Sequence, residues 1–251
     1  MQPAGVDVWL ADLDAGRSRL DILNARWALV PDEERIRAAG IGEQIRAQRW
    51  VSARIVLRLV LATHVGLGRA RAPFAITPRG KPSLASPGPQ FSLSHSGALL
   101  LFAVSSVGPL GVDIETRTTV DTDPRRRAAI ERAAMALAPY APLPTQNDAR
   151  RFLQAWTRLE AVAKASGEGI GHVLTELGLQ GPAAGLTDRH VPSAVTMLAA
   201  QGHSLSVEDL ALDAEAVAAI ALPRRAQVKL CTFPLSLSGI GELEALAQDH
   251  G

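Results

Sequence analysis

Lysine is scarce in this chain of 251 residues, since only three of its 26 basic residues are lysines. Cysteine occurs once, at Cys231, which excludes an internal disulfide framework and a cysteine-rich metal site and is typical of a reducing compartment. Aromatic residues make up 4% of the chain and the formal net charge is +1, so a basic stripe with interleaved aromatics is lacking. We therefore expect no nucleic-acid partner.

Apolar runs long enough to span a bilayer are also missing. The longest run, 98–112, is interrupted by Ser105, Ser106, Gly108 and Pro109. The first residues lack the basic, apolar and small-residue order of a secretory signal. Because 47% of the residues are hydrophobic, the chain can bury a sizeable core as one large domain or two small ones. We expect a cytoplasmic monomer without a membrane partner.

Two carboxylates stand two residues apart in the segment Gly111–Glu115. This segment follows the apolar run 99–104 and a Gly108–Pro109 turn, so we predict that it forms the second strand of a hairpin with that run. Alternation along a strand places Asp113 and Glu115 on one face, where they repel each other unless a cation lies between them. The alternative is an ordinary edge strand with one solvated face.

A second charged cluster, Trp156–Lys164, lies in a helical pattern that runs from 148 to 165. Glu160 and Lys164 are four residues apart, so they project from one face of the helix and can act on the same small volume. The alternative is a surface ion pair of little consequence.

The scarcity of lysine makes Lys81 and Lys164 informative. An ammonium is a compact charge that can release its proton, whereas a guanidinium stays protonated and favours planar partners. A lysine therefore suits a site that must donate to a leaving oxygen or place a point charge between phosphates.

Two more segments carry candidate ligand-binding groups. Arg79–Pro82 reads as a turn in which Gly80 lets the backbone approach a ligand closely. Ser94–Ser96 places a histidine between two hydroxyls, an arrangement that can hold phosphate oxygens. For His95 the alternative is a structural or exposed role.

The order of elements, helix followed by strands, occurs twice along the chain. We therefore predict an α+β fold of two pseudo-symmetric halves, 1–108 and 109–222. Residues 223–251 are left as a C-terminal extension whose role the sequence does not indicate. The elements expected are a strand at 6–10, a helical segment at 32–61, paired strands at 91–93 and 99–104, helices at 124–138 and 148–165, strands at 205–212 and 216–222, and a polar helical end at 240–249.

Taken together, these motifs resemble a known family. Lys81–Pro82, Ser94–Ser96, Gly111–Glu115 and Trp156–Lys164, in this order and spacing, are similar to those of the 4'-phosphopantetheinyl transferases of the surfactin-synthetase type. The resemblance runs from about 32 to 222. It implies an enzyme with two α+β halves, with the active site and coenzyme A in the cleft between them. Such enzymes move the phosphopantetheine arm onto a serine of an acyl or peptidyl carrier protein and release adenosine 3',5'-bisphosphate.

The resemblance also implies roles for the acidic and lysine residues. Asp113, Glu115 and Glu160 would bind Mg²⁺ together with a diphosphate oxygen, an oxygen ligand set that suits this cation. Glu160 would also act as the base for the carrier serine, and Lys164 would stabilise or protonate the leaving oxygen. The half 109–222 would thus be the magnesium and catalytic side.

The half 1–108 would bind the 3'-phosphate and adenine of coenzyme A. By the same resemblance, His95 and Arg49 would hold the 3'-phosphate, and Lys81 would line the adenine and phosphate end. Pro82 and Ser94 belong to the same coenzyme A-binding segments.

The chain departs from the family pattern in two places. Leu159 stands where many relatives have a lysine, and basic residues that some relatives use on the 3'-phosphate fall near Glu33 and Ile36. Two alternatives stay open: a catalytically weak relative that binds coenzyme A or a carrier, and a different metal-dependent phosphoesterase.

Overall fold

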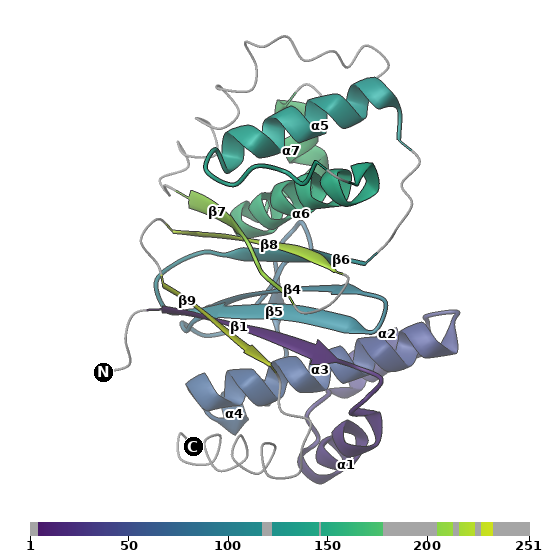
Figure 1. The fold of residues 1–251 in the computed structure, drawn as a ribbon. Helices are drawn as coiled ribbons and strands as arrows, with labels where there is room; N and C mark the ends of the chain where they lie inside the picture. The colour runs from purple at the N-terminus through teal and green to yellow at the C-terminus, as the bar shows by residue number, and fades with distance from the viewer. Residues whose placement is uncertain are drawn as a thin grey trace.

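The computed structural model describes residues 5–116, 122–145, 147–177, 205–212, 216–223 and 227–232. Helices and sheets stack in layers, with two sheets in the middle and helices outside both (Figure 1). In chain order the elements are β1 (Gly5–Asp12), α1 (Arg17–Trp27), α2 (Asp32–Ala39), α3 (Gln44–Val65), α4 (Leu67–Arg71), β2 (Ala75–Ile76), β3 (Pro82–Ser83), β4 (Gln90–Ser96), β5 (Leu99–Ser105), β6 (Gly111–Glu115), α5 (Pro124–Leu137), α6 (Asp148–Ser166), α7 (Ile170–Glu176), β7 (Leu205–Asp209), β8 (Val217–Pro223) and β9 (Gln227–Thr232). The predicted α+β class is confirmed.

The first sheet has the strand order β4-β5-β1-β9. β5 pairs antiparallel with β4 on one side and with β1 on the other. Alternate residues of β5 face α3 on one side and the second sheet on the other, so nearly the whole strand is buried. Burial of both faces explains the apolar run that contains this strand, because neither face meets water.

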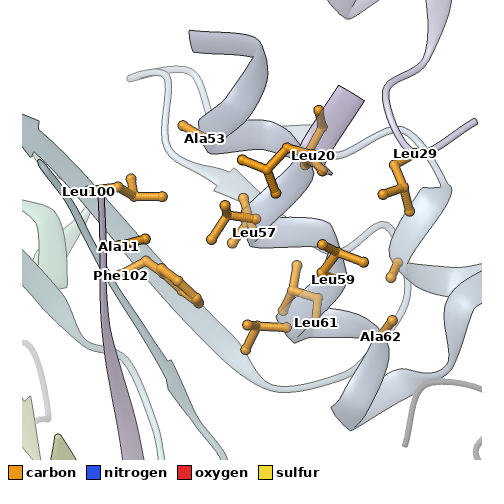
Figure 2. Close-up of a cluster of buried hydrophobic side chains, with 14 of the residues drawn as sticks. Ala11, Leu20, Leu29, Ala53, Leu57, Leu59, Leu61, Ala62, Leu100 and Phe102 are labelled. Atoms are coloured by element: carbon orange, nitrogen blue, oxygen red, sulfur yellow. The ribbon is translucent and has the colours of Figure 1, made fainter. Parts of the chain in front are cut away.

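The outer face of the first sheet is covered by α3, a helix of 22 residues. Phe102 and Leu100 of β5 point toward Leu57 and Leu61 of this helix, and Leu20 of α1 closes the same cluster (Figure 2). These side chains have no exposed surface, or almost none. Each such burial stabilises the fold by about 1.5–3 kcal/mol relative to an exposed side chain.

The second sheet, in the order β6-β8-β7, lies between the first sheet and α6 (Figure 1). Val112 and Ile114 of β6 pack against Val6 and Val8 of β1, which joins the two sheets through one core. On the other face of the second sheet, Ala161 and Val162 of α6 pack against alanines of β8. α5 and α7 cover the outer side of α6.

β6 and α6 approach each other closely at Gly111. A Cβ built on this glycine would lie 2.0 Å from Ala161 O, 2.4 Å from Ala165 N and 2.9 Å from Lys164 C, all backbone atoms. Only a residue without a side chain fits this approach. Gly111 therefore sets the distance between the strand that carries Asp113 and the helix that carries Lys164.

The predicted hairpin between 99–104 and Gly111–Glu115 is wrong. β6 pairs antiparallel with β8, and not with β5. Both edges of β5 are already occupied by β4 and β1, so no free edge is left for β6. The turn at Gly108–Pro109 therefore carries the chain from one sheet to the other.

The C-terminal segment contributes to the first sheet. β9 runs parallel to β1 and pairs with it from Gly5↔Gln227 to Leu10↔Thr232. Part of the predicted extension 223–251 thus adds a strand to the sheet of the first half, while the helical end predicted at 240–249 lies outside the described residues. The boundaries at 108 and 222, and the pseudo-symmetry, stay predictions. Among the described helices, none is both long and apolar enough to cross a membrane.

We expect Gly111→Ala to destabilise the protein by at least about 2 kcal/mol, because the new methyl group would force β6 away from α6. Urea unfolding followed by circular dichroism measures this change. Gly42→Ala is the matched control, since a Cβ at Gly42 meets no atom within 4 Å. Equal stability of the two variants would show that β6 and α6 can separate without cost.

Candidate active site

A cavity of about 390 Å³ lies along β4, the edge strand of the first sheet, and is also lined by residues of α3 and α6. Its wall combines one side of α3, the turn between β2 and β3, the strand β4 and the end of α6. Of the residues predicted to bind coenzyme A or to act in catalysis, the cavity is lined by Lys81, Pro82, Ser94, His95 and Lys164. The structure thus brings together groups that lie up to 83 residues apart.

The serines of β4 form a row that faces β6. Ser92 Oγ accepts a hydrogen bond from Val112 N at 3.2 Å. Ser94 Oγ donates to Asp113 Oδ1 at 2.6 Å, and Ser96 Oγ donates to Glu115 Oε2 at 3.0 Å. Because side chains two apart share a face of a strand, the three hydroxyls meet successive positions of β6 and hold its carboxylates in place.

Asp113 is buried, with 4% of its surface exposed, so it does not lie on the solvated strand face that was the alternative for this segment. Its Oδ1 accepts from Lys164 Nζ at 2.7 Å as well as from Ser94. Its Oδ2 is buried and has no hydrogen-bond partner among the described residues. A buried carboxylate oxygen without a partner is costly, so this atom is free to take a cation or a donor.

Glu160 lies one helical turn before Lys164 on α6. Burial raises the pKa of Glu160, and the nearby carboxylates of Asp113 and Glu115 raise it further, while Lys164 lowers it. Removal from water and neighbouring negative charge both disfavour the ionised form of a carboxyl group. Glu160 therefore lies close enough to the two carboxylates of β6 for their negative charge to raise its pKa.

The predicted magnesium ligands Asp113, Glu115 and Glu160 stay a prediction. Within the part of the chain that the structure describes, no three His, Cys, Asp or Glu side chains are grouped closely enough to hold a metal ion. Asp113 is turned toward Lys164 and Ser94, and Glu115 toward Ser96. The partnerless Oδ2 of Asp113 and the mutual repulsion at Glu160 nevertheless fit a divalent cation with oxygen ligands.

Lys81, the last residue before β3, reaches from the β2–β3 turn to the end of α6. Its ammonium donates to Leu110 O at 3.2 Å, to Lys164 O at 2.5 Å and to Ala165 O at 3.4 Å. Burial lowers the pKa of Lys81 to about 8. The side chain therefore connects a turn of the first half to β6 and α6 of the second.

His95 lies at the end of β4 beside the cavity. Partial burial lowers the pKa of His95 most, and the positive charges of Lys164, Arg46 and Arg54 lower it further. The carboxylate of Asp113 opposes these charges and raises the pKa, so His95 has positive charges on several sides and one negative charge nearby. Such surroundings favour an anionic ligand.

Arg49 is not brought to the cavity wall. Its guanidinium forms two hydrogen bonds to the carboxylate of Asp14, at 2.5 Å and 3.1 Å. This hydrogen bonding raises the pKa of Arg49 and lowers that of Asp14. The predicted contact of Arg49 with a 3'-phosphate stays a prediction.

Trp50 and Arg54 are large side chains of the cavity wall that the sequence analysis did not name as candidates. The Arg54 guanidinium lies 4.7 Å from the centre of the Trp50 ring, and Arg79 Nη2 lies 2.9 Å from Glu168 Oε2. The spacing of Trp50, Arg54 and Arg58 at four-residue intervals in an apolar helix was the signal that could have found Trp50 and Arg54. Arg79 belongs to the turn Arg79–Pro82 that the sequence analysis singled out.

Comparison with known proteins finds one family whose members this chain resembles in sequence. Residues 109–221 match the model of the 4'-phosphopantetheinyl transferase superfamily, and this match contains Asp113, Glu115, Glu160 and Lys164. The chain is 32% identical to the 4'-phosphopantetheinyl transferase HetI of Nostoc sp. over 171 residues, which cover 66% of this chain and 70% of HetI.

Two further relatives are similar at lower identity. A putative 4'-phosphopantetheinyl transferase of Synechocystis sp. is 27% identical over 175 residues, 68% of each chain. The 4'-phosphopantetheinyl transferase psf-1 of Bacillus pumilus is 27% identical over 172 residues, 67% of this chain and 70% of psf-1.

We expect Glu160→Gln to raise the melting temperature near neutral pH. Because folding raises the pKa of Glu160, the folded state binds its proton more tightly than the unfolded state. The protonated Glu160 side chain therefore stabilises the folded state fully below the unfolded pKa of about 4.3. This stabilisation is lost as the pH rises through the raised pKa of the folded state. The gain from glutamine should appear above that value and vanish below about pH 4.

Melting curves of the wild type and Glu160→Gln across this pH range measure the difference. Glu208→Gln, the same change at an exposed carboxylate of β7, is the control and should show no such pH-dependent gain. A Glu160→Gln protein that is less stable than the wild type at neutral pH would contradict the electrostatic picture of the site.

Proposed function

The chain belongs to the 4'-phosphopantetheinyl transferase superfamily, and from this premise we propose that it uses the cavity beside Asp113 to transfer phosphopantetheine from coenzyme A to a carrier protein. The single observation that carries this proposal is the Asp113 carboxylate. One of its oxygens is held by Lys164 and Ser94, and the other is buried and available. This arrangement adjoins a cavity wall that carries the basic residues Arg54, Arg79 and Lys81.

Coenzyme A is the donor, and its phosphates meet the basic side of the cavity. His95 lies in the combined field of Lys164, Arg46 and Arg54, which supports a role in holding the 3'-phosphate. Ser94, Pro82 and Lys81 form part of the same wall. For Arg49 to join this site, its guanidinium would have to leave Asp14.

Mg²⁺ is the metal that this oxygen-rich corner suits. Asp113, Glu115 and Glu160 would hold it, and the partnerless Oδ2 of Asp113 is the atom best placed to do so. When bound, the ion would neutralise the charge that builds up on the diphosphate. It would also relieve the repulsion that raises the pKa of Glu160.

The reaction needs a base and an acid, and α6 supplies a candidate for each. Glu160, with its raised pKa, accepts the proton of the carrier serine as the serine oxygen forms its bond to the phosphorus next to pantetheine. The bond from that phosphorus to the bridging oxygen breaks, and Lys164 donates to this leaving oxygen. The products are the holo carrier protein and adenosine 3',5'-bisphosphate.

Membership of the superfamily favours transfer over a coenzyme A-binding relative without activity and over a phosphoesterase, and no observation on the described residues favours either alternative. We further propose that the enzyme is of the surfactin-synthetase type, monomeric and cytoplasmic. The motif order in one chain and its similarity to psf-1 support this assignment.

Incubation with coenzyme A, Mg²⁺ and a panel of apo carrier proteins should add one phosphopantetheine to a carrier serine, as seen by intact mass. Chelation of Mg²⁺ should stop the reaction, and added Mg²⁺ should restore it. Hydrolysis of coenzyme A with an unmodified carrier would support the phosphoesterase instead. Binding of coenzyme A without either reaction would support the inactive relative.

Lys164→Arg should lower the turnover rate by roughly 10²-fold or more, because a guanidinium cannot take the place of a small donor at the leaving oxygen or release its proton. Its positive charge is kept, so the melting temperature should change little. Lys229→Arg, a matched exchange at an exposed lysine of β9, should leave turnover unchanged. Full activity of Lys164→Arg would show that Lys164 serves only as an ion-pair partner of Asp113.

A further inference from the structure

All three protons of the Lys81 ammonium can be assigned to backbone carbonyls. A lysine ammonium has three donors and no acceptor, and the three acceptors are Leu110 O, Lys164 O and Ala165 O. In this arrangement no donor is left over for a phosphate oxygen. The side chain that the sequence suggested as a ligand contact is therefore fully used within the protein.

Two of the three carbonyls belong to the last turn of α6. The last four carbonyls of any helix lack partners within the helix. Ala163 O accepts hydrogen bonds from Gly167 N and from the Ser166 hydroxyl. Lys164 O and Ala165 O both accept from the Lys81 ammonium. A positive charge at this end is also favoured by the helix dipole. Lys81 thus caps two carbonyls at the end of the helix that carries Glu160 and Lys164.

The third carbonyl, Leu110 O, directly precedes β6. The next residue, Gly111, lies at a close approach between β6 and α6, and Asp113 follows two residues later. One ammonium therefore joins the end of α6 to the start of β6 at the place where they touch. These are the two elements whose side chains meet in the Lys164–Asp113 contact of 2.7 Å.

The backbone of Lys81 is itself held firmly. Thr77 N donates to Lys81 O at 2.9 Å, and Lys81 N donates to Thr77 Oγ1 at 3.0 Å. Gly80, with φ of +88°, closes the turn, and the pairing of Ile76 with Pro82 fixes its base. Because the turn is anchored in this way, it fixes where the Lys81 ammonium lies. The ammonium in turn holds the three carbonyls that it binds.

We propose that Lys81 is a positioning residue for the transfer reaction: by bridging α6 and β6 from the β2–β3 turn, it sets Glu160 and Lys164 against Asp113 and Glu115. This inference rests on the proposed function. Lys81 acts on the rate through the last turn of α6, and contributes little to the affinity for coenzyme A. A phosphate-binding lysine would show the opposite pattern.

Lys81→Met tests this distinction, since methionine keeps a long unbranched side chain and removes the three donors. Turnover at saturating coenzyme A should fall by roughly 10- to 100-fold, the cost of a small misplacement of reacting groups. The dissociation constant of coenzyme A, measured by titration calorimetry, should stay within about twofold of the wild type. Lys229→Met is the matched control and should change neither quantity.

Chemical rescue separates positioning from loss of fold. In a Cys231→Ser background, Lys81→Cys alkylated with bromoethylamine regains an ammonium at nearly the same reach and should recover most of the lost turnover. If Lys81→Met binds coenzyme A more weakly but keeps its turnover at saturation, the proposal is overturned. Lys81 would then be a residue that binds coenzyme A. Unchanged turnover with only a lower melting temperature would overturn it too, and wild-type inactivity toward every carrier would count against the proposed function.

Discussion

The junction between β4 and β6 is the constraint on which the site depends. These strands belong to different sheets, and no backbone pairing joins them. Hydroxyls of Ser92, Ser94 and Ser96 span the gap instead, and each meets a different group of β6. Because the row repeats every second residue, it fixes both the separation of the strands and their register. The carboxylates of the site are held by the same contacts that join the two sheets.

The buried and mutually repelling charges of the site lower the stability of the folded state. Asp113 is buried with one oxygen lacking a partner, and burial and neighbouring carboxylates raise the pKa of Glu160. Such strain in polar groups is expected where charges are arranged for chemistry and not for stability. Lys164 offsets part of this cost through its contact with Asp113. A divalent cation would offset more.

Two lysines of this arginine-rich chain lie at the cavity and have different surroundings. Lys164 points its ammonium at a carboxylate, while Lys81 points its ammonium at carbonyls. Arginine fills the buried structural positions, as Arg58 does by donating to Ala70 O and Ala72 O. The planar guanidinium suits such paired acceptors, whereas a compact ammonium suits the convergence of three acceptors on one point.

The sequence by itself determined the α+β class, the helix that presents Glu160 and Lys164 on one face, and the turn around Gly80. These features depend on local periodicity and turn chemistry, which neighbouring residues carry. Only the tertiary structure decided that β6 pairs with β8, that Gln227–Thr232 joins the first sheet, and that Asp113 is buried. Strand partners and burial depend on which edges and faces distant segments have already occupied. The same reason explains why Arg49 meets Asp14 and why Arg79 reaches the cavity wall, since both contacts join segments far apart in the chain.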